Sequence, residues 1–249
     1  MNSILYKKTA PAGAIKEKGK THMDPSEVRI IDLKESILAD NDADADKLRE
    51  ELAAEKTVYI NVMSSPGSGK TSTILRLVEE LRLSYKVGVL EADIDGDVDT
   101  KTMLSAGIPS IQLHTGGMCH LDADMSRQSL REIGSEDLDI VILENVGNLV
   151  CPAEFDTGAQ INLVILSVPE GDDKPLKYPL MFSKADVVVV NKIDAMEAFD
   201  FSPEKFKRYV AECRPEAPVF MVSAYTGEGI KALAEWLRER AKEILEYVS

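Results

Sequence analysis

Apolar residues follow two alternating patterns along most of the chain. Short continuous runs rich in β-branched residues are typical of strands that are buried on both faces of a sheet. Runs with apolar residues three and four positions apart lie between them and are typical of amphipathic helices. We expect strands at residues 57–63, 86–92, 109–114, 138–146, 162–168, 186–193 and 217–224. We expect helices at residues 71–83, 98–107, 121–134, 203–214 and 229–248. The alternation predicts an α/β fold, a three-layer sandwich with a mostly parallel sheet.

The N-terminal part of the chain has a different pattern. Residues 31–55 place apolar side chains at helical spacing before the first predicted strand. We therefore expect an N-terminal helical extension over residues 28–56. Residues 1–27 precede it and lack the long apolar core of a secretory signal, so we expect a mobile tail.

A run of small residues, SSPGSGKT, follows the first predicted strand at residues 64–71. It matches the phosphate-binding pattern G-x-x-x-x-G-K-[ST] except that Ser64 replaces the first glycine. In such a loop the backbone N–H groups face the phosphates, Lys70 pairs with the β- and γ-oxygens, and the Thr71 hydroxyl binds Mg²⁺. The alternative is a glycine-rich turn between a strand and a helix. We expect nucleotide contacts from Gly67, Ser68, Gly69, Lys70, Thr71 and Ser72.

A second motif, NKID at residues 191–194, follows a predicted strand and favours guanine. The Asp194 carboxylate can accept hydrogen bonds from guanine N1–H and the 2-amino group, whereas adenine would leave it desolvated and unpaired. The Lys192 stem would cover the base. We expect base contacts from Asn191, Lys192 and Asp194, and from Ser223 and Ala224 at the next strand end. The alternative is a polar cap on a strand. The two motifs predict a P-loop GTPase domain over residues 57–249 that binds GTP and GDP.

Acidic residues follow two further predicted strands. Glu91, Asp93, Asp95 and Asp97 lie close together in sequence, and Glu144 ends the apolar run DIVILE. A carboxylate at such a position holds Mg²⁺ or orients the attacking water. We expect Lys70, Asp93 and Glu144 to be catalytic, and Thr71, Asp93 and Glu144 to bind Mg²⁺. A solvated acidic loop is the alternative for Asp95 and Asp97.

Two loops carry candidate ligands for a transition metal. Cys119 and His120 are adjacent in one, and Cys151 lies in the loop that follows Glu144. Cysteine and histidine bind Zn²⁺ and Ni²⁺. Because lone cysteines are commonly small buried hydrophobes, buried thiols are the alternative. Cys213 lies on a predicted helix away from every motif, and we expect it to be structural.

The overall charge narrows the range of partners. The chain has 249 residues and a formal net charge of −14 at pH 7, which disfavours nucleic acid and membranes as partners. The three cysteines form no disulfide framework and fit a cytoplasmic location. No apolar run reaches the roughly 18–20 residues that cross a bilayer.

Several segments together resemble the HypB family of hydrogenase nickel-incorporation GTPases, which belongs to the SIMIBI class. They are SSPGSGKTS, TGGMCHLDADM, LENVGNLVCPAEFD, EGDDKPLKYP and VSAYTGEG. The resemblance implies a homodimer that forms with GTP and a Ni²⁺ or Zn²⁺ site of Cys119, His120 and Cys151 at its interface. It also implies nickel delivery to the precursor of the hydrogenase large subunit, with the metallochaperone HypA as a partner.

Two other functions stay open at this point. One is a related metallochaperone GTPase that serves urease or a cobalamin-dependent mutase. Urease GTPases place Cys-Pro-His where this chain has Cys119-His120, which argues against that type. The other is a GTP-dependent switch that binds no transition metal.

Overall fold

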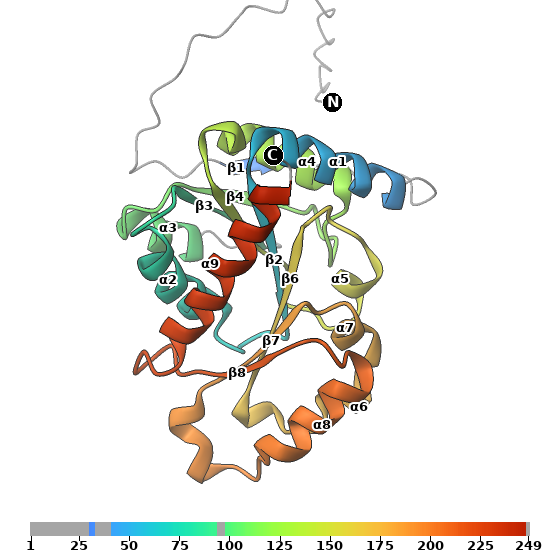
Figure 1. Ribbon diagram of the computed structural model, residues 1–249, viewed down its shortest axis with the longest axis vertical. Helices are drawn as coiled ribbons and strands as arrows, with labels where there is room; N and C mark the ends of the chain where they lie inside the picture. Colours follow the sequence, from blue (N-terminus) through green and yellow to red (C-terminus); the bar gives the residue numbers. More distant parts are fainter. Residues whose placement is uncertain (1–29, 33–40, 94–97, 248–249) are drawn as a thin grey trace, which may run out of the picture.

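The computed structural model describes residues 30–32, 41–93 and 98–247 (Figure 1). Its described strands form one eight-stranded sheet in the order β1-β4-β3-β5-β2-β6-β7-β8, and each of the seven pairings is parallel. The strands are β1 (Ile30–Asp32), β2 (Val58–Ser64), β3 (Val87–Asp93), β4 (Ser110–His114), β5 (Ile140–Glu144), β6 (Ile161–Ser167), β7 (Val187–Asn191) and β8 (Val219–Met221). The predicted α/β sandwich with a parallel sheet is confirmed.

Helices cover both faces of this sheet (Figure 1). They are α1 (Asn41–Glu55), α2 (Lys70–Leu81), α3 (Val98–Ser105), α4 (Ala123–Ile133), α5 (Cys151–Glu154), α6 (Lys174–Lys177), α7 (Pro179–Ser183), α8 (Pro203–Cys213) and α9 (Ile230–Tyr247). Successive strand residues point to opposite faces. In β2, Val58, Ile60 and Val62 pack with α2 and α9, whereas Tyr59 packs with α1 and α4.

The N-terminal extension departs from the prediction. Residues 30–32, expected to belong to a helical segment, form strand β1 instead, and Ile30 pairs with Gln112 of β4. The helix of this region begins at Asn41, whose side chain accepts a hydrogen bond from the N–H of Ala123 at 2.9 Å. The extension therefore contributes both an edge strand and a helix, and the domain boundary near residue 57 stays a prediction.

Helix α1 is fixed to the rest of the fold by apolar and charged contacts. Leu48 and Leu52 are buried in the core that α1 shares with α4. Arg49 donates two hydrogen bonds to the Asp156 carboxylate, at 2.6 and 2.7 Å. Bidentate pairs of this kind are stronger and more directional than single ion pairs. The contact places α1 against the segment that follows α5.

The parallel arrangement brings several strand ends to one edge of the sheet. Ser64, Glu144 and Asn191 are the last residues of β2, β5 and β7. Parallel α/β sheets bind their ligands beyond the carboxyl ends of the strands. Among the described residues, no helix combines the length and apolarity that crossing a bilayer requires.

Candidate nucleotide site and adjacent thiols

The glycine-rich loop joins β2 to α2 in a tightly held conformation. Gly67 and Gly69 adopt positive φ angles of 75° and 90°, and α2 begins at Lys70. The Ser64 hydroxyl accepts hydrogen bonds from Ser68 Oγ at 2.8 Å and from Lys70 Nζ at 2.9 Å. The residue that departs from the motif thus holds both the loop and its lysine.

The NKID segment packs directly on this loop. Asn191 Nδ2 donates to the carbonyl of Ser68 at 2.9 Å, and Asn191 Oδ1 accepts from the N–H of Ala224 at 3.0 Å. Lys192 Nζ donates to the carbonyl of Gly67 at 2.6 Å. One buried asparagine therefore connects the two loops that sequence analysis assigned to phosphate and to base.

A cavity of about 730 Å³ opens between these loops and α2, a volume suited to a small-molecule ligand. Asp194 lines it and accepts a hydrogen bond from Ser223 Oγ at 2.5 Å, which orients the carboxylate. A second hollow of about 450 Å³ lies over the glycine-rich loop. The two share the lining residues Gly69, Ser72, Leu75 and Thr102, so they form one continuous groove.

Acidic side chains gather beside Lys70 and Thr71. Glu144 Oε1 accepts a hydrogen bond from Thr71 Oγ1 at 2.9 Å. Glu91, Asp99 and Glu144 bring their oxygens within 4.8 Å of one another, and Lys70 lines the same cavity of about 350 Å³. Burial raises the pKa of Glu91 well above its usual value, and the charge of Glu144 adds to the effect. Burial also raises the pKa of Glu144, although Lys70 opposes the shift.

The structure leaves part of the magnesium prediction untested. The side chain of Asp93 and all of Asp95 and Asp97 lie outside the described residues. The acid of this segment that lies beside Glu144 is Glu91, one of the four acids named from the sequence, although Asp93 was the one expected to bind Mg²⁺. Only the register of β3 with β5, which pairs Glu91 with Glu144, reveals that neighbour.

A single loop connects the groove to the candidate metal ligands. Glu144 ends β5, and α5 begins seven residues later at Cys151. Between them Gly147 packs so closely on the glycine-rich loop that a Cβ there would lie 3.2 Å from Pro66 Cα. Asn148 Oδ1 then accepts from the N–H of Val150 at 2.7 Å, and its Nδ2 lies 3.5 Å from Cys151 Sγ.

The structure brings Cys119 and Cys151 together. The two half-buried thiols interact, and this interaction raises the pKa of Cys151. His120 instead stacks on Phe155, with ring centroids 3.5 Å apart. In the described part of the chain, the acidic group at Glu91 is the one set of three or more such ligands within 4.8 Å. His120 therefore does not complete a three-ligand site with both thiols in this conformation.

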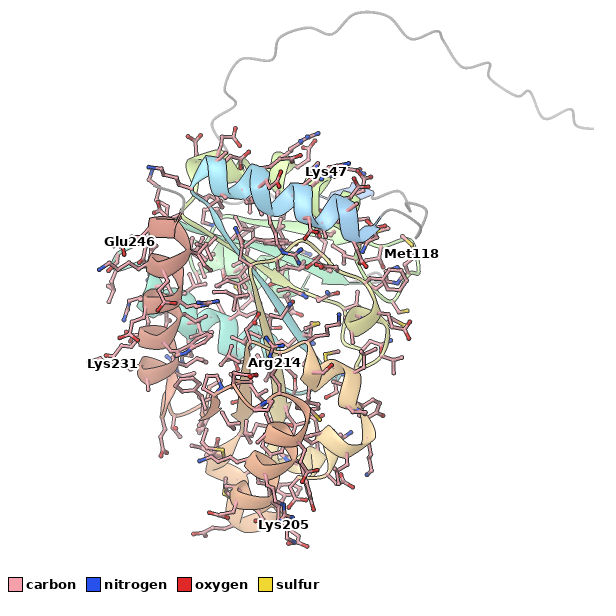
Figure 2. The ribbon with its side chains drawn as sticks, turned by 45° about the vertical axis from the view of Figure 1, so that its right-hand side comes forward. Lys47, Met118, Lys205, Arg214, Lys231 and Glu246 are labelled. Carbon is pink, nitrogen blue, oxygen red and sulfur yellow. The ribbon has the colours of Figure 1, made fainter. Side chains whose placement is uncertain are left out.

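The Cys119 loop lies at the margin of the molecule. Figure 2 shows Met118, the residue before Cys119, at the right-hand side, with Lys231 and Glu246 of α9 at the left. Cys213 lies on α8, where its sulfur is 3.7 Å from the carbonyl of Pro175. That position agrees with the structural role expected for it.

Gly69→Ala tests the packing between the phosphate and base loops. Its Cβ would lie 2.4 Å from Asn191 Nδ2, and its φ of 90° is strained for alanine. Strain and displacement of Asn191 are expected to weaken guanine-nucleotide affinity at least tenfold, which is about 1.4 kcal/mol. Fluorescent GDP-analogue binding measures it. Gly67→Ala is the matched control, since φ is also positive but no atom lies within 4 Å. Equal losses in both variants would show that the Asn191 contact is unimportant.

Comparison with known proteins identifies a matching domain family and relatives of similar sequence and structure. Residues 58–221 match the model of the CobW/HypB/UreG nucleotide-binding domain. The chain is 40% identical over 216 residues to the hydrogenase maturation factor HypB of Rhizobium leguminosarum bv. viciae, covering 87% of this chain and 72% of that protein. Among solved structures, HypB of Helicobacter pylori in complex with nickel superposes with a TM-score of 0.77 at 38% identity, covering 82% of this chain and 96% of that one. HypB of Archaeoglobus fulgidus gives a TM-score of 0.76 at 37% identity, with 82% and 100% coverage.

Proposed function

This chain belongs to the HypB family of hydrogenase maturation factors, and we propose that it is a GTPase that couples GTP hydrolysis to nickel delivery during maturation of nickel–iron hydrogenase. The observation that carries the proposal is the short loop from Glu144 to Cys151. At one end it contacts Thr71 in the groove, and at the other it contacts Cys119. One segment thus spans a nucleotide site and a pair of thiols.

The groove supports GTP as the substrate. Lys70 lies where it can leave Ser64 and pair with the β- and γ-phosphates, and the glycine-rich loop offers its N–H groups to them. The Asp194 carboxylate, held by Ser223, reads guanine N1–H and the 2-amino group. Lys192 covers the base with its stem.

The acidic end of the groove fits Mg²⁺. Glu144 Oε2 is buried and has no hydrogen-bond partner, which is an acceptor suited to a hard cation. Thr71 and Glu144 would hold the ion, and Asp93 stays a proposed ligand. When bound, Mg²⁺ neutralises charge on the β- and γ-phosphate oxygens. Glu144 and Lys70 would then orient the attacking water and the transferred phosphate.

A change in the bound nucleotide is expected to move Cys151 through the loop that begins at Glu144. The Thr71 hydroxyl now donates to Glu144, and turning it toward the nucleotide removes this hydrogen bond. Gly147 rests on Pro66, so a shift of the glycine-rich loop also moves the segment. The separation of Cys151 from Cys119 would then differ between the GTP and GDP states. By linkage, metal must alter GTP affinity by the same factor.

Nickel or zinc would be bound by Cys119, Cys151 and His120, with the metal as cargo. His120 must leave Phe155 to join the thiols, or a second copy of the chain must supply ligands across a two-fold interface. The nickel complex of the Helicobacter pylori relative supports nickel as the cargo. We propose a GTP-dependent homodimer in the cytoplasm, with HypA and the hydrogenase large-subunit precursor as partners.

Titration of the purified chain with Ni²⁺ and Zn²⁺ tests the proposal, first with GDP and then with a non-hydrolysable GTP analogue. We expect metal affinity and the mass measured by light scattering to change with the nucleotide. Lys70→Ala, which removes the phosphate-binding ammonium, should abolish the difference and GTP hydrolysis while leaving metal binding with GDP intact. If the chain binds neither Ni²⁺ nor Zn²⁺, the result favours a GTP switch that binds no transition metal. A failure to activate nickel–iron hydrogenase, despite metal binding, would favour the urease or cobalamin-mutase type.

A further inference from the structure

Two buried carboxylates lie side by side at the acidic end of the groove. Glu91 of β3 and Glu144 of β5 are register partners on neighbouring parallel strands. They are only 3% and 5% exposed. Glu91 Oε1 and Glu144 Oε2 have no hydrogen-bond partner, and both side chains line the cavity of about 350 Å³.

The Glu91 and Glu144 carboxyl groups interact with each other, and the neighbouring polar side chains are hydrogen-bonded elsewhere. Gln112, its neighbour on β4, donates its side-chain amide to the Glu91 carbonyl at 3.1 Å. The other end of that amide accepts from Thr100 Oγ1 at 2.6 Å. Both ends of the Gln112 amide are therefore hydrogen-bonded, one to the backbone of β3 and the other to α3. The hydroxyl of Thr71 is likewise committed to Glu144 Oε1.

Two ionised carboxylates at this position are costly unless a cation accompanies them. Like charges on adjacent strands destabilise a sheet, and a buried carboxyl group needs a counter-charge, a metal or a proton. The cavity is lined by the acids Glu91, Asp99 and Glu144 and by the ammonium of Lys70. With these groups ionised, the lining carries two more negative charges than positive ones. The excess matches one divalent cation, and Mg²⁺ is bound in proteins by one or two carboxylates together with substrate phosphates.

We propose that Glu91 is a second acidic residue of the magnesium site and holds the ion together with Glu144. This inference rests on the proposed GTPase function and adds a residue to its metal site. It also explains why Glu91 occupies the centre of a buried sheet, where an apolar residue would pack without cost. Glu91 acts on the nucleotide through the ion, so it is a positioning residue.

Glu91→Gln keeps the shape of the side chain and removes its charge. The measurement is the affinity of a fluorescent non-hydrolysable GTP analogue as Mg²⁺ is varied, with excess chelator as the metal-free limit. We expect the Mg²⁺ concentration for half-maximal tightening to rise about 10- to 100-fold, the range seen when residues that support a metal are removed. Affinity in chelator should not fall, because the change removes a carboxylate that repels the phosphates when no Mg²⁺ is bound. Glu91→Asp retains the charge and should restore part of the Mg²⁺ response.

Asp122→Asn is the matched control because it makes the same chemical change at an equally buried acid. Asp122 is 3% exposed and caps α4 by accepting from the N–H of Met125 at 2.8 Å. This variant should melt at a lower temperature with an unchanged Mg²⁺ requirement. A wild-type Mg²⁺ requirement in Glu91→Gln would overturn the inference and leave the GTPase proposal standing. A wild-type chain that binds no guanine nucleotide would overturn both.

Discussion

Asp194→Asn is expected to weaken GTP binding by about two to four orders of magnitude and to favour xanthosine triphosphate instead. The carboxylate would accept two hydrogen bonds from guanine, and each bond to a charged group contributes about 1.5–3 kcal/mol. Losing both costs about 3–6 kcal/mol, and 1.4 kcal/mol corresponds to a tenfold change in affinity. Xanthine carries a carbonyl where guanine has its 2-amino group. The asparagine Nδ2 can donate to that carbonyl, so the preference should invert.

Competition between GTP, ATP and xanthosine triphosphate for a fluorescent GDP analogue measures this change. Ser223→Ala is the informative companion variant. It keeps the carboxylate but removes the 2.5 Å hydrogen bond that orients it. We expect a smaller loss of GTP affinity, about tenfold, and no gain for xanthosine triphosphate. Wild-type GTP affinity in Asp194→Asn would show that the cavity does not read the base through this residue.

The sequence predicts the sheet and the long helices well because their patterns are local. Each of the seven predicted apolar runs overlaps an observed strand, and the run at 57–63 corresponds to β2 at Val58–Ser64. β1 was missed because it has three residues, too few for a period, within a stretch of helical spacing. Its identity depends on pairing with β4, which no local pattern encodes. Helices α5, α6 and α7 are also too short, at four or five residues, to show a period.

The candidate site likewise has parts that local sequence patterns predict and parts that depend on tertiary contacts. The glycine-rich loop and the NKID segment were found from sequence because each is contiguous and follows a strand, and the parallel sheet brings them together. The proximity of Glu91 to Glu144 could not be predicted, because it depends on strand order and register. His120 was expected beside the thiols from its position next to Cys119. Its stacking on Phe155 results from tertiary packing that spacing in the chain cannot specify.

Cys151→Ala is expected to lower Ni²⁺ affinity at least about 100-fold and to remove the effect of nucleotide on metal binding. A thiolate is the stronger kind of ligand in the predicted set, and its loss leaves Cys119 without a neighbouring sulfur. Basal GTP hydrolysis with Mg²⁺ but without Ni²⁺ should stay close to wild type, because Cys151 lies outside the groove. Ni²⁺ titration with GDP and with the non-hydrolysable analogue measures both effects. Cys213→Ala is the control. It removes a half-buried thiol near Pro175 and should leave metal binding unchanged.

The pH dependence of wild-type binding gives an independent test of the same site. The interaction with Cys119 raises the pKa of Cys151, which favours the protonated thiol over the thiolate. Metal must displace the proton, and affinity should therefore rise with pH, by about one order of magnitude per pH unit for each proton released. Cys151→Ala should lower that slope by the contribution of one proton. If the variant retains wild-type affinity and slope in the GTP-analogue state, the loop from Glu144 to Cys151 does not couple the nucleotide to the metal. Under the model, wild type must show the reciprocal effect, with Ni²⁺ altering GTP affinity by the factor that GTP alters Ni²⁺ affinity.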